Sequence, residues 1–141
     1  MRGFHAVGVL GCIGVGVVTL SGCSTDVLIW GSDGARVIEV TDQLIGEVAA
    51  DGRSVLVCAN ADVQLGTPAD WEGRSAGEPE RFTGQFWAEQ VPLDPHWSIN
   101  IEGLPEGASP GDQFPGDVFY RESGDGLCVI DVVWATLASR G

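Results

Sequence analysis

The chain has 141 residues, with 7 basic and 20 acidic side chains and a formal net charge of −13 at pH 7. A chain of this length is expected to form one domain that buries its own hydrophobic core. The negative charge argues against a nucleic acid as partner, because contacts to phosphates need clustered Lys and Arg side chains.

The first 23 residues carry the clearest pattern in the sequence. After the basic residue Arg2, an uncharged and mostly apolar run occupies residues 6–20. Its length of about 15 residues suits the hydrophobic region of a secretory signal and is short of the ~20 residues that cross a bilayer. The run ends in Leu20-Ser21-Gly22-Cys23, and this motif resembles the lipobox of bacterial lipoprotein precursors.

The resemblance implies that a diacylglycerol is attached to the thiol of Cys23 and that residues 1–22 are removed as a signal peptide. The mature protein is then expected to be extracytoplasmic and anchored to the cell membrane by this lipid. We expect residues 23–34 to form the lipidated cysteine with a short tether or edge strand, and residues 35–141 to form a disulfide-bonded β domain. The alternative is an ordinary secretory signal whose cleavage site contains a cysteine.

Two cysteines are left for pairing if Cys12 leaves with the signal and Cys23 takes the lipid. Export places Cys58 and Cys128 in an oxidising compartment, so we predict one disulfide between them. Closing a loop of about 70 residues is expected to stabilise the fold by about 4 kcal/mol. The alternative is a pair of buried free thiols.

The first part of the mature chain allows two interpretations. Its Val and Ile content predicts strands at residues 36–40 and 54–59, and Asp51-Gly52 before the second is a favoured hairpin-turn pair. The apolar residues from 40 to 48 also have helical spacing, although Gly46 weakens a helix by about 1 kcal/mol. We adopt the strand–turn–strand interpretation.

Further along, Gly and Pro content predicts long loops at residues 66–81 and 103–116. Extended segments are expected at residues 82–91, 96–102, 117–122 and 127–137, of which the last two form a hairpin. On its second arm, the alternation puts four side chains on one core-facing side: Cys128, Ile130, Val132 and Trp134.

About seven short strands separated by turns predict an all-β fold, a single antiparallel β-sandwich or barrel-like domain after the cleaved N-terminal signal helix. The alternative is an α+β fold with one short helix at residues 41–50.

The catalytic and metal-binding motifs that the sequence suggests are incomplete. Residues 107–111 match the G-x-S-x-G nucleophile pattern, but Pro110 lacks the backbone N–H that stabilises the oxyanion. His96 is the only histidine after the signal, which leaves too few ligands for zinc. We therefore predict no enzyme, no metal and no cofactor. Calcium is the one open metal, because Asp112, Asp117 and Asp125 offer oxygen ligands in or beside loops.

Two aromatic residues in the predicted loops, Trp71 and Phe114, are candidate ligand contacts. The leading functional hypothesis is a lipid-anchored binding or accessory domain that recognises a protein or cell-envelope component through its acidic, aromatic-bearing loops. The alternative is a small carboxylate- or metal-dependent envelope hydrolase. Carboxylates that converge in a pocket with shifted pKa values favour the enzyme, whereas a flat surface with an exposed Trp71 favours binding.

Overall fold

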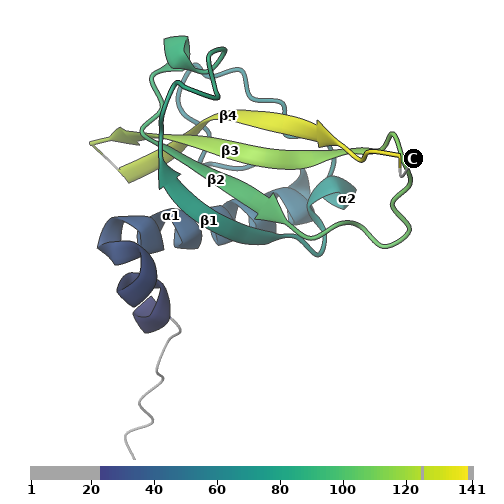
Figure 1. Cartoon of the computed structure of the whole chain (residues 1–141), viewed down its shortest axis with the longest axis horizontal. Helices are drawn as coiled ribbons and strands as arrows, with labels where there is room; N and C mark the ends of the chain where they lie inside the picture. The colour runs from purple at the N-terminus through teal and green to yellow at the C-terminus, as the bar shows by residue number, and fades with distance from the viewer. Residues whose placement is uncertain (1–22, 125, 140–141) are drawn as a thin grey trace, which may run out of the picture.

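A computed structural model describes residues 23–124 and 126–139, and its fold is α+β. The signal peptide predicted at residues 1–22 and the side chain of Cys23 lie outside this description. A long helix, α1 (Cys23–Asp51), packs against one face of an open four-stranded antiparallel sheet (Figure 1). The strands follow each other in chain order across the sheet: β1 (Ser75–Arg81), β2 (Trp97–Glu102), β3 (Gln113–Ser123) and β4 (Gly126–Thr136). Two short helical turns lie in the connections: α2 (Pro68–Trp71) between α1 and β1, and the 3-10 turn Val91–Leu93 between β1 and β2.

The predicted all-β sandwich or barrel of about seven strands is therefore wrong. Residues 36–40 belong to α1, and the segment 54–59 contributes only an isolated bridge between Val57 and Val129. The short helix of the alternative is also too short, because α1 extends through residues 41–50 from a start at Cys23. The edge strand considered for residues 26–30 is helical as well.

Helical periodicity explains why α1 forms where strands were expected. One stripe of this helix is fully or almost fully buried: Val37, Thr41, Leu44, Ile45 and Val48. The Asp51-Gly52 pair ends the helix instead of turning a hairpin, because Gly52 adopts a φ of 69° and donates its N–H to Val48 O at 2.8 Å. A left-handed glycine serves a helix C-terminus and a hairpin turn equally well, so the pair alone does not distinguish them.

Strand β1 lies within the segment predicted as a loop. Its sequence contains Gly77 and Pro79, and its pairing with β2 shifts register between Ala76 and Pro79. Proline and a bulge are tolerated here because β1 is an edge strand, where one side of the backbone has no partner to bond.

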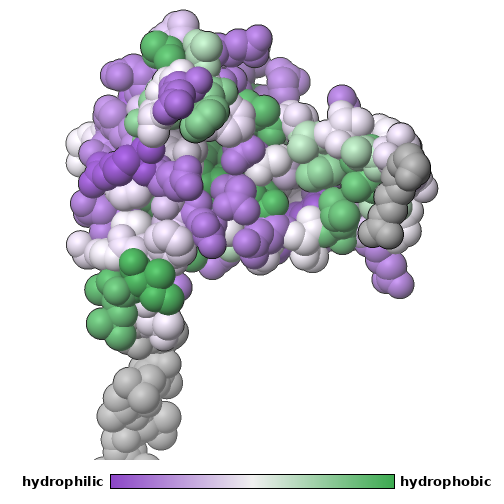
Figure 2. All heavy atoms as spheres, in the orientation of Figure 1, coloured by the Kyte–Doolittle hydropathy of each residue, from purple (hydrophilic) through white to green (hydrophobic). Residues whose placement is uncertain are grey.

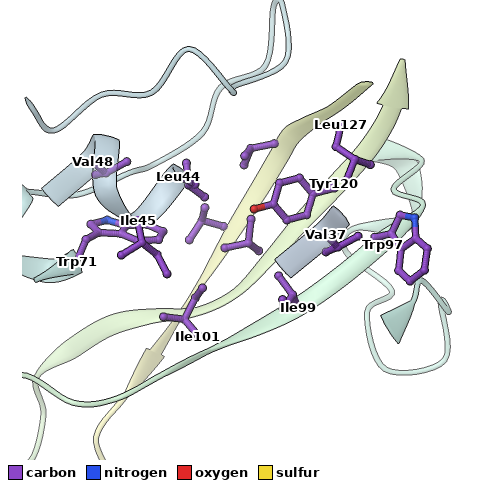
Figure 3. Packing of buried hydrophobic residues seen from close by; sticks show 13 residues of the cluster. Val37, Leu44, Ile45, Val48, Trp71, Trp97, Ile99, Ile101, Tyr120 and Leu127 are labelled. Atoms are coloured by element: carbon purple, nitrogen blue, oxygen red, sulfur yellow. The ribbon is translucent and has the colours of Figure 1, made fainter. Parts of the chain in front are cut away.

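The main core lies between α1 and the inner face of the sheet (Figure 3). Trp71 of α2 is fully buried beside Ile45 and donates its indole N–H to Leu65 O at 2.6 Å. The hydroxyl of Tyr120 lies 2.8 Å from the hydroxyl of Thr41, which in turn donates to Val37 O. This chain of hydrogen bonds joins the helix to the sheet inside the core.

The outer face of the sheet carries a second, smaller cluster under the segments 57–61 and 82–93. Phe119 forms its centre, with the rings of Phe82 and Trp87 packed edge-on at 6.0 and 5.0 Å. The predicted disulfide is present: Cys58 and Cys128 are bonded, and they belong to this cluster.

The prediction that four side chains of the last strand share one face is wrong. Cys128 and Ile130 belong to the outer cluster, whereas Val132 and Trp134 pack with the core under α1. The pairing of β3 with β4 shifts register near Phe119. A bulge of this kind inserts an unpaired residue and reverses which side chains point inward beyond it.

Candidate functional site: an acidic pocket on the outer sheet face

The part of the outer face that the loop segments leave open is a pocket of about 310 Å³ over β1, β2 and β3. We call it the acidic pocket. Its lining combines three carboxylates with polar and aromatic groups: Glu78, Glu80, Asp117, Ser98, Asn100 and Trp87, with Ile99 between them.

The bulge in β1 shapes the edge of the acidic pocket. Asn100 of β2 accepts the backbone N–H of Glu78 through its side-chain oxygen at 2.8 Å. A Cβ at Gly77 would lie only 2.4 Å from this amide group, so the glycine is needed for the close approach. Asn100 therefore holds the bulged strand, and its side-chain NH₂ group is left to bond elsewhere.

Burial and like charges together set the electrostatics of the acidic pocket. Partial burial raises the pKa of the Asp117 carboxyl above its usual value of 3.8, and the negative charge of Glu80 raises this pKa further. Asp117 lies opposite Asn100 in the sheet, and Glu80 lies opposite Ser98. The ion pair present in the described part of the chain is between Arg81 and Asp33. None of the three carboxylates of the acidic pocket is therefore neutralised by a basic side chain in this part of the chain.

Two further groups complete the acidic pocket. Ser98 is more than nine-tenths buried, and it lines the pocket. Trp87 is half-buried and is fixed by its edge-on contact with Phe119.

The candidate ligand contacts from the sequence do not form this site. Trp71 is fully buried in the main core, so it cannot touch a ligand on the surface. Phe114 is half-buried at the start of β3, and the guanidinium of Arg74 lies over its ring at 5.4 Å. The aromatic residue beside the carboxylates is instead Trp87.

Other groups considered in the sequence also lie outside the pocket. His96 accepts the backbone N–H of Glu122 through Nδ1 at 2.8 Å, which fixes its ring at the end of the sheet. Ser109 donates its backbone N–H to the Asp112 carboxylate in an exposed turn, not in a nucleophile elbow. Of the predicted calcium ligands, Asp125 lies outside the described residues.

Sequence reasoning missed Glu78 and Glu80 because they were assigned to a loop. Their spacing of two residues is the signal that could have found them, since it places both side chains on one face of a strand. The polar face of the predicted strand at 96–102 did contain Ser98 and Asn100, but nothing indicated which strands would flank it.

Within residues 23–124 and 126–139, no group of three or more His, Cys, Asp and Glu side chains is arranged to hold a metal ion. No helix in this part of the chain is both long and apolar enough to cross a membrane. The chain matches no protein-family model, no curated protein and no solved structure. Its function must therefore be argued from its own residues.

Proposed function

We propose that this protein is a binding domain held at the outer surface of the cell membrane by a lipid on Cys23, and that its acidic pocket binds an organic ammonium or guanidinium group. The group is carried by a partner in the cell envelope, either as a Lys or Arg side chain or as an amine of an envelope polymer. The anchoring rests on the lipobox resemblance at residues 20–23, and the ligand class rests on the acidic pocket.

The unneutralised charge of the acidic pocket is the observation that carries the ligand class. Three carboxylates line one partly buried site without a basic partner in the described chain, and burial, followed by the negative charge of Glu80, raises the pKa of Asp117. A bound cation relieves this repulsion, whereas an anionic ligand increases it.

The remaining lining groups suit an organic cation. An aromatic ring such as Trp87 attracts a cation placed over its face by about 0.5–2 kcal/mol. The Ser98 hydroxyl and the three carboxylates accept N–H bonds, and a volume of about 310 Å³ accommodates the end of a side chain or a small amine.

One observation favours a second candidate, a carboxylate-dependent glycoside hydrolase. Asp117, with its raised pKa, and Glu80 in the same pocket are the kind of carboxyl pair that such enzymes use. Convergence of carboxylates was also the feature that we expected to favour an enzyme over a binding domain. We place this candidate second for two reasons. The pocket is open, without a segment of the described chain that covers it and excludes water. Two carboxylates without a basic partner are also equally well explained by cation binding.

A titration with matched probes tests the cation-binding proposal. The lipidated full-length protein in detergent micelles is mixed with Nα-acetyl-lysine methylamide, its arginine analogue, putrescine, or the Nε-acetylated lysine derivative, which has no charge. At a hundred times its dissociation constant, a bound probe should raise the free energy of unfolding by about 2.7 kcal/mol and raise the melting temperature accordingly. We expect this rise with the cations and none with the acetylated probe.

Substitutions test whether the rise in melting temperature comes from binding in the acidic pocket. The double substitution Glu80→Gln/Asp117→Asn should abolish the rise, whereas Glu72→Gln/Glu106→Gln, an equal change of charge at two exposed turns, should preserve it. A rise that persists in the double variant, or no rise with any cation, would contradict the proposal. Release of the aryl group from aryl glycosides, lost in Asp117→Asn, would favour the hydrolase instead.

A further inference from the structure

We infer that the first turns of α1 form a membrane-contacting element, in which Val27, Leu28 and Ile29 insert into the interfacial region of the bilayer and fix the tilt of the domain. We call these three residues the apolar turn. The inference rests on the proposed lipid anchor at Cys23, and it assigns a second, non-covalent attachment to the same membrane.

The apolar turn is unusually exposed for its composition. The exposed fractions of Val27, Leu28 and Ile29 are 44%, 86% and 63%. Figure 2 shows a hydrophobic patch at the N-terminal end of the molecule, where the chain leaves the folded body. Contiguous exposed apolar groups of this kind mark contact sites more often than isolated ones do.

The position of the apolar turn identifies the bilayer as its occupant. At a rise of about 1.5 Å per residue, Val27 and Ile29 follow Cys23 by only about 6 and 9 Å along the helix. This short separation keeps the apolar turn beside acyl chains attached to Cys23, and thus within reach of the interfacial region in which apolar helix faces are buried. Three side chains are also too few to supply the about 800 Å² that each partner contributes to a standard protein interface.

The local charges favour apolar insertion over electrostatic attraction. Between Cys23 and Arg36 the only charged residues are Asp26 and Asp33. An acidic segment is repelled by anionic lipids, so the apolar turn must act through burial of apolar surface and should contact neutral lipids well.

An elbow in α1 joins the apolar turn to the domain. Gly31 interrupts the helical geometry with a φ of 73° and a ψ of 174°, and Figure 1 shows the first part of α1 turning away from the sheet at this end. A Cβ at Gly34 would lie 2.7 Å from the Cβ of Trp30 and 3.4 Å from Pro79 of β1. Trp30 therefore packs closely over Gly34 beside the sheet edge, while Leu28 and Ile29 remain outside.

Fluorescence quenching in vesicles tests the inference. Lipidated full-length protein is reconstituted into phosphatidylcholine vesicles whose acyl chains are brominated near the headgroup, and quenching of Trp30 is taken as the difference between the wild type and Trp30→Phe. We expect clear quenching of Trp30, reduced at least about twofold in Leu28→Ser/Ile29→Ser, because polar side chains insert poorly. The matched control Val55→Ser, which changes a side chain that is 87% exposed elsewhere, should leave quenching unchanged.

The outcomes separate the inference from the anchor on which it rests. Mass spectrometry of the peptide that contains Cys23, and vesicle binding of Cys23→Ser, report on the lipid alone. If Cys23 is not acylated, the proposed anchor fails. If Cys23 is acylated and the protein is vesicle-bound but Trp30 is not quenched, the anchor stands and the membrane-contacting element is refuted. Equal quenching in Leu28→Ser/Ile29→Ser, or a dimer that this variant dissociates, would also overturn it.

Discussion

The two faces of the sheet are covered in different ways. The inner face lies under α1, and its side chains form a continuous apolar core with the helix. The outer face lies under irregular segments, held by the Cys58–Cys128 disulfide, and these segments cover only its β3–β4 side with apolar groups. Where a helix packs on a sheet, its apolar stripe needs apolar side chains beneath it. Short irregular segments cover less of the other face and leave room for a polar site such as the acidic pocket.

Removal of the largest buried side chain should strongly destabilise the core on the inner face. Trp71→Ala deletes a fully buried indole and its hydrogen bond to Leu65 O, and we expect a loss of about 5 kcal/mol in the free energy of unfolding. Trp87→Ala on the outer face should cost about 2 kcal/mol, because this ring is only half-buried. Urea unfolding measures both values, and equal losses would contradict the ranking of the two faces.

The outer face should depend on its covalent bond. Cys58→Ala/Cys128→Ala opens a loop with a sequence separation of 70 residues, and we expect a loss of about 4 kcal/mol. Amide exchange would show the largest loss of protection in the segments 57–61 and 82–93, with α1 less affected. Uniform loss over both faces would mean that the two clusters unfold as one unit.

A smaller change tests the polar link inside the main core. Tyr120→Phe removes a hydroxyl that lies 2.8 Å from the Thr41 hydroxyl, while Thr41 keeps its bond to Val37 O. We expect a loss of about 1 kcal/mol, as for a typical buried hydrogen bond. A neutral or stabilising result in thermal unfolding would show that this link contributes nothing to the attachment of α1.

Asp117→Asn should have the smallest effect and the opposite sign at neutral pH. The pKa of Asp117 is raised in the folded state. The fold therefore loses stability as the pH rises from 3.8, the pKa of this carboxyl in the unfolded chain, through its pKa in the folded protein. The variant should therefore melt at a higher temperature than the wild type at pH 7 and at the same temperature at pH 3.

Glu47→Gln supplies a contrasting control on the other side of the molecule. Hydrogen bonds from Ser54 and Gln43 lower the pKa of Glu47, so its charge stabilises the fold above pH 4.5 and this contribution is lost as the pH falls. Glu47→Gln should destabilise the protein at pH 7, and a shift of the same sign in both variants would contradict the assignment of the two pKa directions.

The sequence predicted the parts of the fold whose signals are local. The extended segment expected at residues 96–102 corresponds to β2, and the hairpin at the C-terminal end corresponds to β3 and β4, although β3 begins earlier than expected, at Gln113. The pairing of Cys58 with Cys128 followed from the lipobox resemblance and compartment chemistry, and the structure confirms it.

The rest depended on tertiary context. The Val and Ile residues at 36–40 favour a strand locally, but the periodicity of the stripe from Val37 to Val48 and the sheet beneath it make this segment helical. Strand β1 has almost no strand signal of its own and forms because β2 offers it an edge. The acidic pocket therefore could not be assembled from the sequence, since one of its walls belongs to that strand.

The disulfide also decides how the molecule would carry a mechanical load. A pull between a membrane anchor at Cys23 and a partner in the acidic pocket passes along α1 to Cys58, and from there directly across to Cys128 in β4. Strands β1, β2 and β3 lie within the closed loop, so a pull on the acidic pocket is shared between two arms of the chain, one from Cys58 to β1 and one from Cys128 back through the hairpin to β3. Without the disulfide, the covalent path from the anchor to the pocket would run through the single segment from Cys58 to β1.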